Sequence, residues 1–381
     1  MSSEFEPLPM PATREPFSLL AVDRVVAELR RGRIIAIRGF GGAAMLVRAA
    51  EAATSEALSE ICSISGDSPR IAITARRAAV LGLKETTASV VCLAHEKGLT
   101  AETIHNLAEP LSASPLKNAD LKILEAEPYS CESAAVALTK LARLLPAAII
   151  TKPDLEDSDD LVAWTSRSDL LLVDAGDVFQ YERTAARTLR AVSEARVPLL
   201  DAQETRIIAF RPVDGGLEHL AIVIGNPSVG KPVLTRLHSE CFTGDLLGSL
   251  RCDCGDQLRG AIKEIGEKGS GILLYLAQEG RGIGLVNKLR AYELQDRGFD
   301  TLDANEELGF DADERVYLPA AKMLENLGFT EIDLLTNNPD KVTALSQCGV
   351  KVMNRVPHAF PSNEHNEAYL RTKAVRSGHS F

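Results

Sequence analysis

Residues 257–298 read QLRGAIKEIGEKGSGILLYLAQEGRGIGLVNKLRAYELQDRG, and their hydrophobic pattern alternates between helix and strand. The first part, 257–269, carries apolar side chains at helical spacing and ends at Gly269. These apolar positions are Leu258, Ala261, Ile262 and Ile265. Residues 271–278 form a short apolar run, which is typical of a buried strand, and residues 285–298 return to a helical pattern. This order predicts an α/β domain with helices packed on a sheet.

The alternation continues to the C-terminal side of this stretch. Helices are predicted over 314–328, despite Pro319, and over 339–349, where Pro339 falls in the first turn. Strands are predicted over 331–338 and 350–357.

The first half of the chain is richer in Ala and Leu and poorer in reactive side chains. Helical patterns cover 22–32 and 133–146, and each is followed by a strand pattern, at 33–40 and 147–151. Residues 181–198 are predicted to be helical up to Pro198 and then linker-like. We therefore predict two α/β domains, each a sheet packed with helices, over 1–204 and 205–381.

Composition limits the classes of function. The 381 residues are 45% hydrophobic and 25% charged, with a net charge of −11. This charge argues against a nucleic-acid surface, although a local basic pocket for a phosphorylated ligand is compatible with it. No apolar run reaches the roughly 18 residues of a membrane span. Seven cysteines without a secretory signal predict reduced thiols and a cytoplasmic location, with no membrane partner.

Three of the seven cysteines stand in residues 236–258, RLHSECFTGDLLGSLRCDCGDQL. Cys241, Cys252 and Cys254 have the spacing C-x10-C-x-C, and three thiolates can hold one Zn²⁺. His238 as a fourth ligand would make such a site structural, whereas water in the fourth position would make it catalytic. Buried free cysteines are the alternative to a metal site. Charged residues surround the thiols, namely Arg236, Glu240, Asp245 and Arg251.

Two loops after predicted strands suit a phosphorylated ligand. Residues 278–284, QEGRGIG, combine Arg281 with three glycines that allow a close backbone approach. In the second loop, Thr336 ends a strand and Lys341 lies in the first turn of a helix, where phosphate binds readily. Taken alone, each loop is also compatible with an ordinary turn, and Lys341 with a surface lysine.

Together these motifs resemble the GTP cyclohydrolase II family of riboflavin biosynthesis. The resemblance runs from about Thr205 to the C-terminus. Its motifs are RLHSECFTGDLLGSLRCDCG (236–255), QEGRGIGLVNKLRAYELQDRGFDT (278–301), LGFDADER (308–315), LLTNNPDKV (334–342) and NEAYLRTKAVRSGH (366–379). The resemblance implies the GTP cyclohydrolase II fold for the C-terminal domain.

It also implies a reaction and its residues. GTP would lose C8 as formate and its outer phosphates as pyrophosphate, leaving 2,5-diamino-6-(5-phosphoribosylamino)pyrimidin-4-one. Carried over by motif, Cys241, Cys252 and Cys254 would bind one Zn²⁺ per chain, with water as the fourth ligand. Asp313 matches a proton acceptor and Arg315 a proposed nucleophile, and Tyr292 matches an active-site tyrosine. The residues implied in GTP binding are Arg236, Leu237, His238, Ser239, Glu240, Gln257, Glu279, Gly280, Arg281, Thr301, Thr336 and Lys341.

Further expectations follow from the resemblance. We expect Mg²⁺ with the GTP phosphates and a homodimer, as is typical of the family. The alternatives are a cyclohydrolase paralogue that retains the formyl group, and a non-catalytic GTP-binding regulatory protein.

The first half resembles 3,4-dihydroxy-2-butanone 4-phosphate synthase, which implies that family's α/β fold. The segments that carry this resemblance are RRGRIIAIRGFGGAAMLVRAAEAAT (30–54), RIAITARRAAVLGL (70–83) and SAAVALTKLARLLPAAII (133–150). The synthase family has an acidic cluster for Mg²⁺ after its first strand, but residues 38–44 here contain no carboxylate. A His-Thr-Glu triplet of that family aligns with Cys131, Glu132 and Ser133. We therefore expect a degenerate domain that keeps the fold and lacks the synthase activity.

Overall fold

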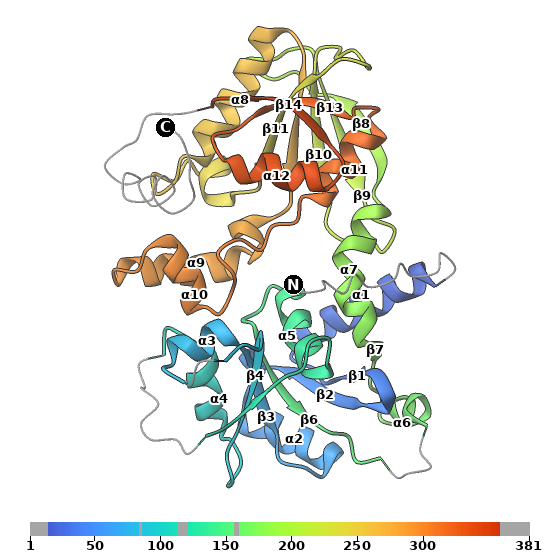
Figure 1. Ribbon diagram of the computed structural model, residues 1–381, viewed down its shortest axis with the longest axis vertical. Helices are drawn as coiled ribbons and strands as arrows, with labels where there is room; N and C mark the ends of the chain where they lie inside the picture. The colour runs from blue at the N-terminus through green and yellow to red at the C-terminus, as the bar shows by residue number, and fades with distance from the viewer. Residues whose placement is uncertain (1–13, 84–85, 113–120, 156–159, 359–381) are drawn as a thin grey trace. The chain divides into compact units, whose positions relative to one another are not determined.

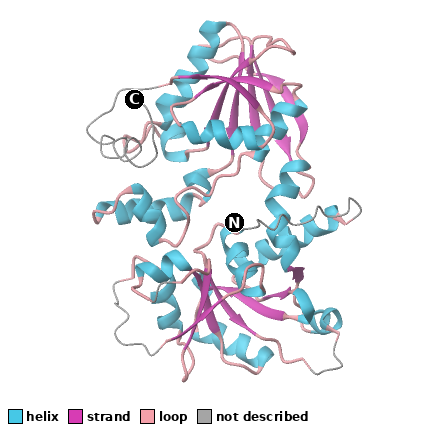
Figure 2. Ribbon diagram, in the orientation of Figure 1, coloured by secondary structure: helices cyan, strands magenta, loops and turns pink. Residues whose placement is uncertain are grey.

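The computed structural model describes residues 14–83, 86–112, 121–155 and 160–358 (Figure 1). This part of the chain divides into two compact units. The first unit contains the residues up to Glu182 together with Val286–Glu314, and the second contains Arg183–Leu285 and the residues from Arg315 onward. Each unit is a sheet covered by helices, so the predicted α/β class with two sheet-and-helix domains is confirmed (Figure 2).

The sheet of the first unit has the strand order β5-β4-β3-β6-β2-β1-β7. All neighbouring strands pair antiparallel except β1 and β7, which pair parallel. The strands are β1 (Ile35–Arg38), β2 (Ala44–Ala49), β3 (Arg70–Thr74), β4 (Val90–Ala94), β5 (Lys122–Glu125), β6 (Ala147–Thr151) and β7 (Leu172–Asp174).

Helices α1 and α5 supply much of the apolar core of this unit. Val22, Val25 and Leu29 of α1 pack with Ala134 and Leu138 of α5, and all five are almost fully buried. The helices are α1 (Glu15–Arg30), α2 (Ser55–Ser65), α3 (Ala75–Val80), α4 (Ala101–Ala108), α5 (Cys131–Leu141), α6 (Leu161–Arg167) and α7 (Ala175–Arg187). Two later helices, α9 (Leu285–Asp296) and α10 (Thr301–Glu307), fold with this unit.

The sheet of the second unit has the order β14-β13-β11-β12-β10-β9-β8. Its β11, β12, β13 and β14 pair parallel, and the remaining pairs are antiparallel. The strands are β8 (Arg190–Arg196), β9 (Thr205–Arg211), β10 (His219–Ile224), β11 (Val233–Ser239), β12 (Gly271–Leu276), β13 (Glu331–Leu335) and β14 (Lys351–Val356). The parallel strands end at one edge of the sheet, which is where ligands bind in α/β folds.

Helices cover both faces of this second sheet. Ala261 and Ile265 of α8 (Cys254–Lys268) pack in one apolar cluster, and Ala320 and Leu324 of α11 (Leu318–Asn326) pack in another. The remaining helix is α12 (Pro339–Gln347). Proline lies in the first turn of both α11 and α12, where its missing N–H costs nothing. The helix predicted over 314–328 is therefore confirmed in its C-terminal part.

One secondary-structure prediction is wrong. The helix predicted up to Pro198 ends at Arg187, and residues Arg190–Arg196 form the edge strand β8. The side chains of β8 are all exposed, so its sequence has no buried face to reveal a strand. Pairing of its backbone with β9 imposes the extended conformation.

The compact units also differ from the predicted domain limits. Residue 204 lies between β8 and β9, which are neighbours in one sheet, whereas the units separate at Glu182 and Arg183. In addition, Val286–Glu314 packs with the first unit although it follows most of the second in sequence. As a division between two functions, the boundary after residue 204 stays a prediction.

Among the described residues, no helix is long and apolar enough to cross a membrane. The motif at 366–379 lies outside the described residues.

Candidate functional site

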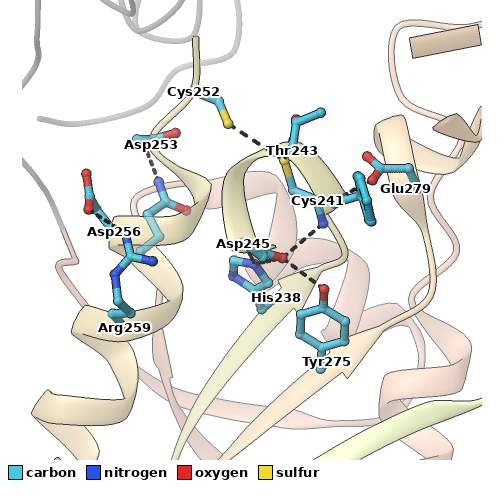
Figure 3. A network of polar contacts seen from close by, with 12 residues as sticks. His238, Cys241, Thr243, Asp245, Cys252, Asp253, Asp256, Arg259, Tyr275 and Glu279 are labelled. Carbon is cyan, nitrogen blue, oxygen red and sulfur yellow. Dashed lines mark hydrogen bonds and ion pairs between the residues drawn. The ribbon is translucent and has the colours of Figure 1, made fainter. Parts of the chain in front are cut away.

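The three cysteines predicted to act together meet beyond the end of β11, and Figure 3 shows two of them, Cys241 and Cys252. Their sulfur atoms all lie within 4.8 Å of one another, and the Sγ atoms of Cys241 and Cys252 are 3.7 Å apart. Cys241 follows β11 by two residues, and Cys254 is the first residue of α8. The chain therefore brings the thiols together by placing a strand end against a helix start.

The short turn Phe242–Leu246 makes this approach possible. Gly244 lies so close to the thiols that a Cβ atom there would stand 2.8 Å from Cys252 Sγ and 3.1 Å from Cys241 Sγ. Any larger residue would push the sulfurs apart.

The thiols fit a soft cation. A hydrogen bond with Cys241 is the main factor that raises the pKa of Cys252 to about 11, and burial adds to it. Hydrogen bonds with Cys241 and Cys252, together with burial, raise the pKa of Cys254 well above its ordinary value. Neighbouring thiolates repel one another, and a divalent cation with thiolate affinity relieves that repulsion. The donor set of three clustered sulfurs is one that zinc uses.

A buried carboxylate holds the loop of the first cysteine. Asp245 accepts hydrogen bonds from the backbone N–H of Cys241 at 3.0 Å and from the hydroxyl of Tyr275 at 2.9 Å. His238 Nε2 lies 3.0 Å from both oxygens of Asp245. A carboxylate only accepts, so Nε2 of His238 carries the proton. The loop is thus anchored to β11 through His238 and to β12 through Tyr275 (Figure 3).

His238 therefore has a partner other than the sulfurs. Its ring stacks on Tyr275 with 5.5 Å between centroids, and burial lowers the pKa of His238. Among the described residues, the group of potential metal ligands at this place comprises the three cysteines and does not include His238. A closed site with histidine as the fourth ligand is not the arrangement that this structure has.

Glu279 anchors the same loop from the other side. It is almost fully buried, and its Oε2 accepts the backbone N–H of Phe242 at 2.6 Å. The following residues, Gly280 and Arg281, both adopt left-handed backbone conformations, with φ of 64° and 60°. A non-glycine residue in this region is strained, and such strain concentrates at functional sites. The QEGRGIG loop is thus a fixed turn beside the thiols.

Two buried cations lie at the parallel end of the second sheet. Arg236 is 4% exposed; its guanidinium donates to Leu335 O at 2.9 Å and to Gln257 Oε1 at 2.6 Å. Burial lowers the pKa of Arg236 to about 10, so it stays charged at neutral pH. Its Nε has no hydrogen-bond partner among the described residues, which is costly for a buried donor.

Lys341 is the second cation. It lies in the first turn of α12, is 8% exposed, and donates from Nζ to Leu237 O at 3.2 Å. Asn338 caps this helix by accepting the backbone N–H of Asp340, and Thr336 accepts the N–H of Asn338. The lysine predicted as a possible surface residue is buried, and it reaches the backbone of β11.

The remaining predicted site residues divide between the two units. Those in the second unit, besides the ones described above, are Ser239, Glu240 and Arg315. The guanidinium carbon of Arg315 is 5.9 Å from the ring centroid of Tyr317. Tyr292, Thr301 and Asp313 belong to Val286–Glu314 and are described with the first unit. There Lys288 Nζ lies 5.7 Å from the ring centroid of Tyr292.

Comparison with known proteins identifies the family of this chain. The family model of GTP cyclohydrolase II matches residues 190–357. A GTP cyclohydrolase-2 of Azospirillum brasilense is 56% identical over 365 residues, covering 96% of this chain and 94% of the relative. The chain belongs to the GTP cyclohydrolase II family. The prediction of an enzyme of this family is thereby confirmed.

The chain is also similar to relatives named riboflavin biosynthesis protein RibBA. The riboflavin biosynthesis protein RibBA of Bacillus cereus is 40% identical over 298 residues, covering 75% of this chain and 74% of the relative. Among solved structures, the chain is similar to RibBX, a two-domain 3,4-dihydroxy-2-butanone 4-phosphate synthase from A. baumannii, with 19% identity and a TM-score of 0.36. That match covers 88% of this chain and 99% of RibBX.

Two residues of this candidate site were not predicted from the sequence. The sequence presents Asp245 only as one of several charges near the thiols, and Tyr275 only as part of a buried strand. Nothing in the spacing indicates that Asp245 is buried, because a carboxylate in a glycine-containing loop is more often solvated. The one available signal is its position four residues after Cys241.

Asp245→Asn should weaken metal binding. The change removes the charge that holds the N–H of Cys241 and the ring of His238, so the first thiol loses its fixed position. Loss of a supporting group of this kind costs roughly 10–100-fold in metal affinity. Zinc retained against a graded chelator measures the effect.

The matched control is Asp256→Asn. Asp256 lies on the exposed side of α8 and pairs with Arg259 at 3.0 Å, so the same substitution there should leave zinc affinity unchanged (Figure 3). Equal zinc affinity in the Asp245 variant and the control would contradict the anchoring role.

Proposed function

We propose that this family member is a zinc-dependent GTP cyclohydrolase II that converts GTP to 2,5-diamino-6-(5-phosphoribosylamino)pyrimidin-4-one, formate and pyrophosphate, the first step of riboflavin biosynthesis. The observation that carries the proposal is the cluster of Cys241, Cys252 and Cys254 at the ligand-binding edge of the second sheet. A zinc ion bound there would supply a Lewis acid for hydrolytic opening of the imidazole ring. Its ligands would be the three thiolates.

The chain's own residues would bind and orient GTP. Arg236 and Lys341 are buried cations on the same edge as the thiols, and they suit the phosphates. Departure of pyrophosphate leaves negative charge on the departing group, which fixed cations stabilise. Arg281 and the left-handed turn at Gly280 would contribute backbone and guanidinium donors. We include Leu237, Ser239, Glu240, Gln257 and Thr336 in the GTP site.

His238 and Glu279 take more specific parts in this proposal. The side chains of both residues form hydrogen bonds with the cysteine loop. His238 bonds to Asp245, and Glu279 accepts the backbone N–H of Phe242. They would therefore act on the reaction mainly by fixing the thiols. Contact with GTP remains part of the proposal for both.

Proton transfer and phosphate chemistry are assigned to residues around Val286–Glu314. We propose Asp313 as the proton acceptor, Tyr292 as a further active-site residue and Thr301 as a GTP contact. Arg315 would act at the α-phosphate. Because a guanidinium stays protonated in proteins, stabilisation of charge is a better-supported role for Arg315 than covalent attack.

We further propose that the first half has no synthase activity. Arg38, the last residue of β1, donates to Asp174 at 2.5 Å, and Arg14 pairs with the same carboxylate. Although burial alone would raise it, these two arginines lower the pKa of Asp174, and they occupy its oxygens. Burial raises the pKa of Cys131 to about 11, so the thiol at the position of the family's histidine stays protonated at neutral pH and would not carry a proton as an imidazole does. Neither group can replace a Mg²⁺-binding acidic cluster.

A homodimer, Mg²⁺ with the phosphates and a cytoplasmic location stay predictions from the sequence and its resemblance.

Incubation of the purified chain with GTP tests the proposed reaction. Formate and pyrophosphate should each appear in a 1:1 ratio to GTP consumed, and mass spectrometry should find the deformylated pyrimidinone. Pyrophosphate without formate would indicate a paralogue that retains the formyl group. Binding of GTP without turnover would indicate a regulatory protein.

Cys252→Ser should lose both zinc and ring opening. A serine hydroxyl is a poor ligand for zinc, so two thiols remain and the ion is released. Metal analysis should find about one zinc in the unmodified chain and far less in the variant. Cys348→Ser is the control, because Cys348 is a cysteine of the second unit outside the cluster. A variant that opens GTP at the normal rate would refute the role of the cluster.

Ribulose 5-phosphate should yield no dihydroxybutanone phosphate, even in excess Mg²⁺. The physical reason is the absence of carboxylates at residues 38–44 together with the loss of the histidine. Formate release and product mass measure the reaction, and a GTP assay on the same sample shows that the chain is folded. Measurable turnover would show that the first half is a second enzyme.

A further inference from the structure

The segment Val286–Glu314 lies within the matched cyclohydrolase region, yet it folds with the first unit. Its interior is deeply buried there, since Ala304, Leu308 and Phe310 are each at most 1% exposed. Helix α10 packs against α3, as the orange and blue elements of Figure 1 indicate. The first unit therefore provides the surroundings in which this segment takes its shape.

The contact between Val286–Glu314 and the first half has a buried polar centre at the start of α3. The hydroxyl of Thr74 donates to Gly309 O at 2.7 Å, and it also caps α3 by accepting the N–H of Arg77 at 3.2 Å. Arg77, which is 4% exposed, donates to Glu307 O at 2.9 Å and to Leu107 O at 2.9 Å. The carbonyls at the C-terminal end of α10 would otherwise lack partners, and a cation is favoured at that end of a helix.

Charges surround this centre. Arg76 pairs with Asp311 at 2.6 Å and with Glu306 at 3.0 Å. Lys140 pairs with Glu314 at 2.6 Å, and the backbone N–H of Asp311 donates to Glu314 Oε1 at 2.7 Å. Asp311 and Glu314 stand on either side of Asp313 in the sequence. The backbone that carries Asp313 is thus fixed before and after it.

A second attachment holds α9, the helix that carries Tyr292. Arg290 pairs with Glu109 at 3.0 Å and with Glu51 at 3.3 Å, and the side-chain amide of Asn287 donates to Arg143 O at 3.0 Å. These contacts come from parts of the first half that are far apart in sequence. They need the folded first unit and not merely a nearby peptide.

Gly309 shows how close the attachment is. Its φ is +85°, and a Cβ atom there would lie 2.9 Å from Thr74 Oγ1, 3.1 Å from Arg77 Cβ and 3.1 Å from Pro146 Cγ. The segment could not approach α3 in this way with any other residue.

We propose that the first unit is the positioning platform of the cyclohydrolase, with Thr74 and Arg77 as positioning residues that hold the segment carrying Asp313 in its reactive conformation. The proposal rests on the proposed function, because it takes Asp313, Thr301 and Tyr292 to act on GTP. It gives the fold of a degenerate synthase a role that needs none of the synthase's chemistry. Neither Thr74 nor Arg77 touches substrate in this role.

The test changes Gly309 to alanine in the full chain, which leaves every group of the first half intact. Gly349→Ala is the matched control, because Gly349 has a φ of +89° and no atom within 4 Å of its would-be Cβ. Both substitutions impose the same backbone strain, and only the first pushes the segment away from Thr74. Readouts are kcat and KM for GTP, zinc per chain, and amide hydrogen exchange over residues 301–311.

Gly309→Ala should lower kcat on the order of 10–100-fold, since small displacements of reacting groups cost that much. It should also speed exchange over 301–311, with zinc still at the level of the unmodified chain. Gly349→Ala should keep kcat and exchange near normal. Equal losses in the two variants, unchanged kcat in Gly309→Ala, or loss of zinc in parallel with kcat would each overturn the proposal.

A pair of substitutions at Thr74 tests the same contact from the other side. Thr74→Val removes the hydroxyl that donates to Gly309 O, whereas Thr74→Ser keeps it. We expect kcat to fall in the valine variant and to be restored in the serine variant, and equal rates would contradict the role of the hydroxyl. If the unmodified chain fails to turn over GTP, the proposed function is rejected, and the positioning role in catalysis is rejected with it. The hydrogen-exchange data then show only whether Gly309 and Thr74 hold residues 301–311 in place.

Discussion

The carboxylate of Asp245 holds the loop of Cys241 against the second sheet, and the geometry of the thiols depends on this attachment. It gathers a backbone N–H, a tyrosine hydroxyl and an imidazole around one buried charge. A hydrogen bond to a buried charged group typically contributes about 1.5–3 kcal/mol, so loss of any one partner weakens the attachment. Because β11 and β12 are parallel neighbours, His238 and Tyr275 reach Asp245 from adjacent strands. The sheet thereby fixes the loop of Cys241, and with it the position of the Cys241 sulfur.

The reactive groups of the proposed enzyme come from two compact units. The thiols, Arg236 and Lys341 belong to the second unit, whereas Asp313 and Tyr292 belong to a segment that folds with the first. On the proposed function, the contacts between the first half and Val286–Glu314 hold the segment that carries Asp313 and Tyr292. That role would give this chain a physical reason to keep the fold of its first half although residues 38–44 hold no carboxylate.

Much of the fold and the cluster of cysteines could be predicted because the sequence signals for them are local. Alternating helix and strand patterns, helix-ending glycines and the spacing of the thiols gave the α/β class and the convergence of Cys241, Cys252 and Cys254. What could not be predicted depends on tertiary pairing. Strand β8 has no buried face, so only its hydrogen bonds to β9 make it a strand. In the same way, nothing in LGFDADER indicates that Gly309 meets Thr74, a residue 235 positions earlier. The burial of Asp245 and Lys341 likewise follows from the fold and not from their neighbours in sequence.

The most direct test of the zinc-dependent reaction is a metal titration. The chain is stripped of metal by a chelator, and zinc is returned in steps while formate release from GTP is recorded. We predict that activity rises linearly and stops at one zinc per chain, the stoichiometry of a single three-thiolate site. Full formate release from the metal-free chain, or activity that rises without relation to bound zinc, would contradict the account.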